Sequence, residues 1–384
     1  MKNFLINYAY KVFNRNVQDP EIVPGHNGPY YDPETPVRNT GHWLITLTQC
    51  YRWSGDKAFK NGVIKLASSL MAEDARPNGF SFHHRKSGSD ACNGLMGQAW
   101  TFEALAAAAH CLNDESCMLL AEDVFFQHPF DAQRGLWHTL DIDGQDLSFD
   151  PTFNHQLWFA ACASLIQGKR TKEIHDRVLR FIECLPYNLT VLDNGLIYHP
   201  IVWFWDEELK RANTWKLKGR RFLGNLYRTV KNCSWAFTQI SEEELRRKNV
   251  YKSVGYHSFN MYAFGLLKLQ FPHHSIWESD FFLPLVAYLS SDEFQTDLEH
   301  NTYGYPYNPP GFEVPFALGC FATLDQVMLI QTCQQWIDRQ FAHGLNSQTG
   351  FLDRNTDDPA TASARIYELT KVSESILDKI NPPC

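Results

Sequence analysis

The sequence predicts an all-α fold, a double-layered (α/α)6 toroid built from six helical hairpins, and three observations lead to it. Helical periodicity dominates the 384 residues, whereas the alternating pattern of strands is scarce. Segments that are apolar on nearly every side recur roughly every 50 to 60 residues, with one interval near twice that length. Between them fall amphipathic helices that are apolar on one side only. Because a helix that is apolar all round must be covered by protein on both sides, the first kind forms an inner ring and the second an outer ring.

Six segments of the first kind are expected to form the inner ring. They begin near Arg38, Asn93, Thr152, Gly255, Pro310 and Pro359. Outer helices are expected near residues 56–73, 114–127, 171–185, 275–290 and 325–342, and the N-terminal helix can close the ring as the sixth. We expect a single domain over residues 1–384, with an insertion at about residues 194–250 that fills the long interval.

Composition and charge narrow the classes of function. The formal net charge of -8 disfavours a nucleic-acid binder, and 14% aromatic residues provide rings that stack on sugars. No apolar run reaches the roughly 18 to 20 residues needed to span a bilayer, and the N-terminus lacks the pattern of a secretory signal. The ten cysteines contain no C-x-x-C pair, which fits a reducing compartment. We therefore expect a soluble, cytoplasmic protein.

The predicted insertion contains a basic stretch. From Lys210 to Lys231 the chain carries eight Lys or Arg residues and no acid. This stretch can contact an anionic polymer, phosphate groups or a membrane surface. The alternative is a solvated helical hairpin whose charge is balanced by acids elsewhere.

Polar side chains precede each inner segment. The six preceding loops are rich in turn formers, aromatic residues, histidines and carboxylates. In a toroid the inner helices run parallel, so the loops that lead into them meet at one end of the barrel. The helix N-termini there also point partial positive charge toward a common region, which favours carboxylates and anionic ligands. The sequence therefore predicts a shared binding site at this end.

One short motif carries a family resemblance. Asp90 followed by GQAW, from Gly97 to Trp100, resembles the inner-helix entrance of unsaturated glucuronyl hydrolases, in which an aspartate six residues before the glycine is the general acid/base. Hairpins with such starts and SGD turns, as in YRWSGDKAF from Tyr51 to Phe59, are similar to the N-acylglucosamine 2-epimerase group. The resemblance implies a carbohydrate-active enzyme. Here the aspartate stands seven residues before the glycine, the motif lies in the second hairpin rather than midway along the chain, and Met96 replaces the usual arginine.

The leading hypothesis is a glycoside hydrolase that acts on a uronic-acid-containing or related oligosaccharide. Asp90 is the expected acid/base, and Asp150 and His155 are expected to assist, because glycoside hydrolysis uses paired carboxylates. Both aspartates equally fit a role as helix N-caps. The residues expected around the sugar include arginines that can clamp a carboxylate and tryptophans that can stack on a ring. They are Arg38, His42, Trp43, Gln98, Trp100, Trp158, His257, Glu313 and Arg365. Glu313 also fits a salt-bridged core acid, and the tryptophans also fit packing.

The sequence is also compatible with two other functions. His42, His155 and His257 are expected in the first turns of inner helices, and two histidines facing each other, His155 and His257, suit a sugar epimerase. A non-catalytic module that binds a polysaccharide or a partner is the third reading. No cofactor and no metal are expected: DIDGQD, from Asp141, has Thr152 where a calcium loop needs a glutamate, and His83 and His84 lack the H-E-x-x-H context of zinc sites.

Overall fold

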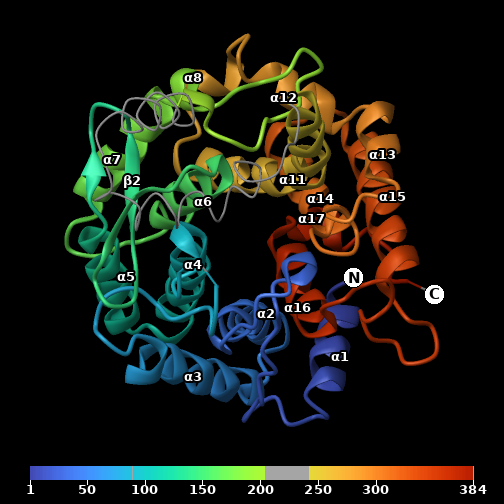
Figure 1. Cartoon of the computed structure of the whole chain (residues 1–384). Helices are drawn as coiled ribbons and strands as arrows, with labels where there is room; N and C mark the ends of the chain where they lie inside the picture. Colours follow the sequence, from blue (N-terminus) through green and yellow to red (C-terminus); the bar gives the residue numbers. More distant parts are fainter. Residues whose placement is uncertain (89, 204–241, 384) are drawn as a thin grey trace.

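The computed structural model describes residues 1–88, 90–203 and 242–383. Helices arranged in two concentric layers form a toroid (Figure 1), which confirms the predicted (α/α)6 class. The basic stretch from Lys210 to Lys231, together with most of the predicted insertion, lies outside the described residues.

The inner ring follows the predicted order. It consists of α2 (Val37–Ser54), α4 (Gly94–Leu112), α6 (Phe153–Ala163), α11 (Glu242–Gln270), α14 (Pro310–Phe321) and α16 (Pro359–Ala364), which continues as the 3-10 helix η5 (Arg365–Lys371). Each helix from α2 to α11 packs against the next one in this list, and η5 packs against both α14 and α2. The ring is therefore closed.

The outer layer covers the outside of this ring. It consists of α1 (Lys2–Val12), α3 (Lys57–Met71), α5 (Glu115–Gln127), α7 (Thr171–Glu183), α12 (Leu283–Leu289), α13 (Asp292–Leu298) and α15 (Gln326–Gly344). Short helical turns connect the layers: η1 (Gly28–Tyr30), η2 (Glu73–Ala75), α8 (Leu185–Asn188), η4 (Ser275–Glu278) and α17 (Glu374–Leu377). The hydroxyls of Tyr8 in α1 and Ser363 in α16 lie 2.9 Å apart, so the N-terminal helix occupies the sixth outer place.

Burial differs between the layers as the sequence pattern predicts. In α4 every residue from Gly94 to Ala106 is buried, because α2 and α6 flank the helix on either side in the ring and α5 covers it from outside. In α3 only one face is buried, and Asp56 caps this helix by accepting the Ala58 N–H at 2.9 Å. The apolar core thus lies between the two layers, and polar residues of the inner helices are left for the barrel axis and its ends.

Two neighbouring inner helices begin with the same local device. The side-chain amide of Gln98 in α4 accepts the Phe82 N–H at 2.8 Å and donates to the Phe82 carbonyl at 3.3 Å. The amide of Gln156 in α6 makes the same pair of bonds to Trp137, at 3.0 and 2.7 Å. Each amide also donates to the carbonyl six positions earlier, at 3.1 and 3.3 Å. These glutamines therefore fix the loops that lead into the inner helices.

Two parts of the chain differ from expectation. Helix α11 begins at Glu242 rather than near Gly255, because the stretch from Glu242 onward is rich in good helix formers. A three-stranded antiparallel sheet in the order β1-β2-β3 was not predicted; its strands are β1 (Phe130–Asp131), β2 (Leu136–Leu140) and β3 (Asp146–Phe149), too short to show a clear alternating pattern.

Residues 141–145 form the turn between β2 and β3, which agrees with their interpretation as a turn. Gly144 adopts φ 84°, and a Cβ atom there would lie 2.7 Å from the Phe80 ring. Within the parts of the chain that the structure describes, no helix has the length and apolarity required to cross a bilayer.

Candidate active site

Polar and charged side chains gather where the inner helices begin. We call this group the amino-end cluster and define it as Arg38, Arg85, Asp90, Asp150, His155, His199 and Lys252. Three of the seven, Asp90, Asp150 and His155, are the residues predicted to be catalytic.

The start of α4 brings Asp90 and Asp150 together. Asp90 Oδ1 accepts the Gly94 N–H at 3.0 Å, and Asp150 Oδ2 accepts the adjacent Leu95 N–H at 3.4 Å. Gly94 has φ 58°, and a Cβ atom at this position would lie 2.5 Å from Asp150 Oδ2. Only glycine therefore lets the two carboxylates approach the same helix end, where the helix dipole favours negative charge. Asp90 thus caps α4, as the alternative interpretation proposed, whereas Asp150 was expected to cap α6 and instead reaches the start of α4 from the loop before α6.

Asp150 also orients His155. Asp150 Oδ2 lies 2.7 Å from His155 Nδ1, with the Asp150 side chain 7% exposed and the His155 side chain 22% exposed. An ionised carboxylate on Nδ1 favours the tautomer that carries its proton there and leaves Nε2 with a free lone pair. Burial opposes ionisation of Asp150, but His155 and the backbone N–H groups of Thr152 and Leu95 outweigh it and hold the pKa of Asp150 below its usual value. Asp150 is therefore an acceptor near neutral pH.

His199 and Lys252 complete this side of the cluster, and sequence reasoning did not single out either of them. The His199 ring centroid lies 4.8 Å from that of Tyr256, and its Nδ1 is buried without a hydrogen-bond partner among the described residues. Burial, followed by the positive charges of Lys252 and His155, holds the pKa of His199 well below its usual value. His199 is therefore neutral at pH 7.

Lys252 lies in a group of tyrosines. Its half-buried Nζ is 5.0, 5.6 and 5.8 Å from the ring centroids of Tyr30, Tyr256 and Tyr303, and no carboxylate pairs with it within the described ranges. Burial, with a smaller effect of the nearby charge of Arg85, lowers the pKa of Lys252 to about 8. The ammonium is still charged at pH 7, and the tyrosine rings stabilise it only partly. It is available to an anionic group.

Arg38 has unused hydrogen-bonding capacity. Its Nη1 donates to Glu34 at 3.1 Å and to Asn27 at 3.3 Å, and its guanidinium carbon lies 4.0 Å from the Trp100 ring centroid. Nε and Nη2 are buried and have no partner among the described residues. Buried donors are nearly always paired in native proteins, so these two nitrogens are candidates for contact with a ligand or ordered water.

Arg365, the other arginine predicted to clamp a sugar carboxylate, is fully paired inside the protein. Its Nη2 donates to Glu313 and Glu368, both at 2.6 Å, and its Nη1 donates to Asn308 at 2.6 Å. Nε donates to Glu368 at 3.1 Å. With Ser258, which donates to Glu313 at 2.6 Å, these residues form what we call the closed cluster: Ser258, Asn308, Glu313, Arg365 and Glu368. Its geometry is that of a core salt bridge, the alternative reading for Glu313.

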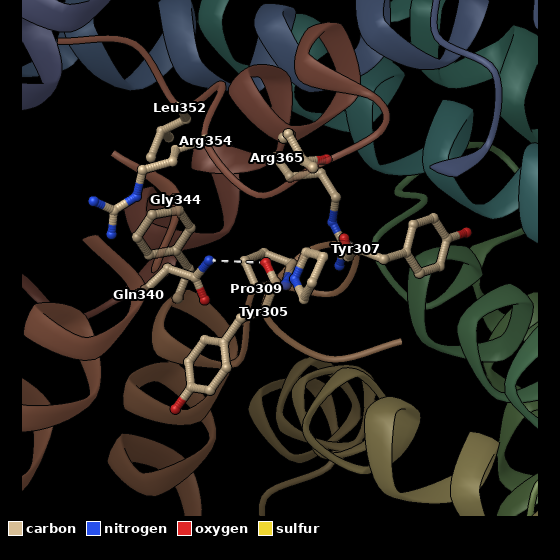
Figure 2. A pocket seen from close by; sticks show the side chains of 12 residues that line it. Tyr305, Tyr307, Pro309, Gln340, Gly344, Leu352, Arg354 and Arg365 are labelled. Atoms are coloured by element: carbon tan, nitrogen blue, oxygen red, sulfur yellow. Dashed lines mark hydrogen bonds between the residues drawn. The ribbon is translucent and has the colours of Figure 1, made fainter. Parts of the chain in front are cut away.

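The cavity beside Arg365 does not add a site. Figure 2 shows Arg365 and Tyr307 at a cavity of about 20 Å³ that Gln340, Leu352 and Arg354 also line. That volume holds about one water molecule. A sugar therefore does not fit there.

The remaining predicted contacts lie away from the amino-end cluster or serve the fold. His257 lies in the middle of α11, where its Nε2 is 3.1 Å from the Leu285 carbonyl and its ring packs on Tyr288, so it faces the outer layer rather than His155. The predicted pair of His155 and His257 is therefore not assembled, because His257 stands on the face of α11 that packs against α12. His155 makes a small contribution to the lowered pKa of His199, so these two histidines belong to the same cluster.

The aromatic candidates divide between packing and the barrel axis. Trp43 packs on Tyr8 and Phe13 on the outer side, and Trp158 stacks on Phe259 with ring centroids 4.3 Å apart. His42 is buried on the axis between Trp100 and Tyr367, and burial first, then the charges of Arg38 and Arg365, holds its pKa well below the usual value. Gln98 is committed to the loop bonds described above. Of the aromatic candidates, Trp100 lies against Arg38 of the cluster.

No metal site is assigned. Among the residues that the structure describes, no three His, Cys, Asp or Glu side chains come together in an arrangement suited to holding a metal ion.

Solved structures share this fold. The chain superposes on D-mannose isomerase (14% identity, TM-score 0.61, covering 99% of this chain and 98% of that one). It also superposes on cellobiose 2-epimerase from Spirochaeta thermophila (11%, 0.61, 98% and 97%) and on an unsaturated glucuronyl hydrolase specific for heparin (12%, 0.57, 100% and 100%). At such identities the likeness shows the fold alone, which is an (α/α)6 barrel, and the predicted fold is confirmed.

Sequence similarity then places the chain more narrowly. No protein-family model matches it. It is 40% identical over 359 residues to archaeal glycosylation protein Q of Haloferax volcanii, an alignment that covers 93% of each chain. The chain belongs to the family of that protein.

Proposed function

We propose that this chain is a carbohydrate-active enzyme that transfers a proton at a carbon next to a sugar carbonyl, as an isomerase or an epimerase. The observation that carries the proposal is the 2.7 Å contact between Asp150 Oδ2 and His155 Nδ1 at the barrel end where the helices begin. A histidine held in this way presents Nε2 as a general base. The 22% exposure of the His155 side chain leaves that nitrogen within reach of a ligand.

The neighbouring residues supply the other parts of such a reaction. His155 Nε2 takes the proton from the carbon next to the carbonyl of an open-chain sugar, and the electron pair moves onto the carbonyl oxygen to form an enediolate. A cation close to that oxygen stabilises the charge, and Lys252 and Arg38 are the candidates. If the former carbonyl carbon takes up the proton, and the hydroxyl proton of the neighbouring carbon passes to the enediolate oxygen as the new carbonyl forms, the product is an isomer. Delivery of a proton to the opposite face of the same carbon gives an epimer. This needs a proton donor on that face, and His199, which is neutral at pH 7, is suited there only to the role of base in the reverse reaction.

Positive charge in the amino-end cluster favours an anionic sugar. Lys252 has no carboxylate partner within the described ranges, and two nitrogens of Arg38 are unpaired there. Helix N-termini add partial positive charge at the same end. A uronate or another acidic sugar is therefore the substrate class that we infer, in line with the expectation from sequence.

Glycoside hydrolysis is the second candidate, and one observation favours it. Asp90 and Asp150 accept adjacent backbone N–H groups, which holds two carboxylates at one place as hydrolysis requires. However, a glycosidase needs one carboxyl that keeps its proton near neutral pH, and the lowered pKa of Asp150 leaves that role to Asp90, which is ion-paired with Arg85 at 3.4 Å. This arrangement suits proton abstraction by His155 better than acid catalysis by a carboxyl group.

Product analysis separates the two candidates. The wild-type protein is incubated with a panel of free hexoses, hexuronates and uronate-containing disaccharides, and the products are separated by chromatography with mass detection. Isomerisation or epimerisation gives a new sugar of unchanged mass, and hydrolysis gives two fragments that together contain one added water. A panel in which only fragments appear, and in which His155→Ala retains full activity, contradicts the proposed function.

A further inference from the structure

A second hollow lies at the other end of the barrel, where the inner helices terminate. It has a volume of about 240 Å³. Glu103, Ala107 and His110 of α4 line it, together with Gln270, the last residue of α11, and Lys371, the last residue of η5. Because these residues come from separate members of the inner ring, the cavity lies at the carboxyl end of the barrel.

The carboxylate of Glu103 is its most unusual feature. Glu103 is 1% exposed, and neither of its oxygens accepts a hydrogen bond from any described residue. Its partner is the ammonium of Lys371, with Nζ 3.0 Å from Oε1 and the Lys371 side chain 26% exposed. A buried carboxylate that has one ion partner and no hydrogen bonds is costly to the fold. Both Glu103 oxygens are shielded from solvent, so the polar group of this pair that a ligand can reach is the Lys371 ammonium, which can donate to a hydroxyl group.

The charge balance of the cavity indicates a neutral ligand. Glu103 and Lys371 carry opposite charges at 3.0 Å, so Lys371 disfavours a cation. The carbonyl ends of the inner helices and Glu103 itself disfavour an anion. Gln167 and Gln270, which also line the cavity, each offer both donors and acceptors. The wall at Ala107 is small and apolar and can accept the face of a ring.

We propose that this cavity is a second binding site, for a neutral polyhydroxylated ligand the size of one monosaccharide unit. Its volume lies below the roughly 300 Å³ at which sites for drug-sized ligands begin. Glu103 stands nine residues into α4 from Gly94, which places it about 14 Å along the helix from the amino-end cluster. The two sites are therefore distinct, and this one does not depend on the proposed function.

The test measures binding of D-glucose, D-mannose and D-galactose to the full chain by saturation-transfer NMR and titration. We expect at least one of them to bind with a dissociation constant on the order of millimolar. Ala107→Trp fills the cavity from a half-exposed position and is expected to weaken that binding at least tenfold. Glu103→Gln, which keeps the size of the side chain and removes its charge, is expected to weaken it as well. Lys172→Met is the control and is expected to bind as the wild type does, since Lys172 is exposed on α7 and pairs with Asp176.

Two results overturn the proposal. One is the absence of binding by all three sugars at concentrations of about 50 mM. The other is binding that Ala107→Trp leaves unchanged and His155→Ala abolishes, since the sugar then binds in the amino-end cluster. The second result contradicts the second binding site but not the proposed function, so the experiment tests the two proposals independently.

Discussion

The amino-end cluster and the closed cluster each contain a buried arginine with acidic neighbours, yet the two arginines differ in how completely their nitrogen atoms are paired. All three nitrogens of Arg365 donate to protein groups, at distances between 2.6 and 3.1 Å. One nitrogen of Arg38 does so, and the other two are buried without a described partner. The sequence-based prediction gave both arginines the same role, that of binding a sugar carboxylate. Their hydrogen bonds show that Arg38 has nitrogens left for a ligand and that Arg365 has none.

This difference distinguishes a structural polar group from one kept for a ligand. A buried charge that satisfies all its hydrogen bonds within the fold has no capacity left for a substrate. A half-exposed group such as His155, oriented by one strong contact to Asp150, keeps an atom free for chemistry. We therefore expect variants in the closed cluster to change stability and variants in the amino-end cluster to change activity.

The largest expected effect is on stability. Arg365→Met leaves Glu313 and Glu368 buried without their cation, and we expect a loss of about 3 to 5 kcal/mol in the free energy of unfolding, measured by urea denaturation. His155→Ala, from the amino-end cluster, is the control and should lose less than about 1 kcal/mol. If the two variants lost equal amounts of unfolding free energy, the proposed difference between a structural cluster and a ligand-binding cluster would be wrong.

The second prediction concerns activity. His155→Ala should lower kcat by about 10² to 10⁴ because it removes the general base, and Asp150→Asn should lower it as well because the amide no longer fixes the tautomer. Glu313→Gln is the matched carboxyl-to-amide control in the closed cluster, and its kcat should stay within a few-fold of wild type. Turnover is measured on the substrate found in the sugar panel. Full activity of the His155→Ala variant would contradict the assignment of His155 as the general base.

The sequence predicted the fold more completely than it predicted the candidate site. The alternation of all-round apolar and one-sided apolar helices predicted both layers, because that contrast follows directly from which surfaces are covered. Helix α11 was placed too late and the strands β1 to β3 were missed, because the polar start of α11 and the short strands carry little periodic signal. The pattern Gln-x-Trp occurs at both Gln98 and Gln156, and this repeat in the sequence could have predicted a structural role for Gln98.

The arrival of the candidate site's side chains at one end of the barrel was predictable from the sequence, but their hydrogen-bond partners were not. Asp90, Asp150 and His155 precede or begin inner helices, so their arrival at one end follows from the fold. The contact of Asp150 with the start of α4 depends on the left-handed conformation of Gly94, which the sequence does not reveal. Lys252 was missed because α11 was expected to begin only after it, whereas His199 stands in one of the polar loops already expected at this end.

A smaller effect is expected at Lys252. Lys252→Met should raise KM for an acidic sugar about tenfold, because it removes a cation without a carboxylate partner in the described ranges, and should leave KM for a neutral sugar unchanged. Lys172→Met is the control, since Lys172 is exposed and pairs with Asp176 on α7. Initial rates on an acidic and a neutral sugar give the comparison. An equal change for both sugars would argue against anion recognition by Lys252.

The smallest expected effect is a pH slope that has opposite signs in the two clusters. Burial raises the pKa of Glu313 to about 7 even though Arg365 and Ser258 lower it, whereas the unfolded carboxyl titrates near 4.5. Between these values the folded state holds a proton that the unfolded chain has released, so Glu313 lowers stability as pH rises from about 4.5 to about 7.

Asp150 acts in the other direction. Because the pKa of Asp150 is lowered in the folded state, this group stabilises the fold at pH values above its usual pKa near 3.8. This contribution is lost as the pH falls below that value. Urea denaturation at several pH values should therefore show Glu313→Gln gaining on wild type as pH rises from 4.5 to 7. Asp150→Asn should gain on wild type as pH falls below 4. Parallel curves for the wild type and both variants would show that neither pKa shift is present.

Proton exchange with solvent tests the central assignment most directly. The protein is incubated in D2O with the acidic sugar that it converts, and deuterium at the carbon next to the carbonyl is followed by NMR. We expect the wild type to introduce deuterium at that carbon, His155→Ala to do so at least 100-fold more slowly, and Glu313→Gln to do so at close to the wild-type rate. Conversion of the sugar without any deuterium uptake, or equal uptake by His155→Ala and wild type, would contradict that assignment.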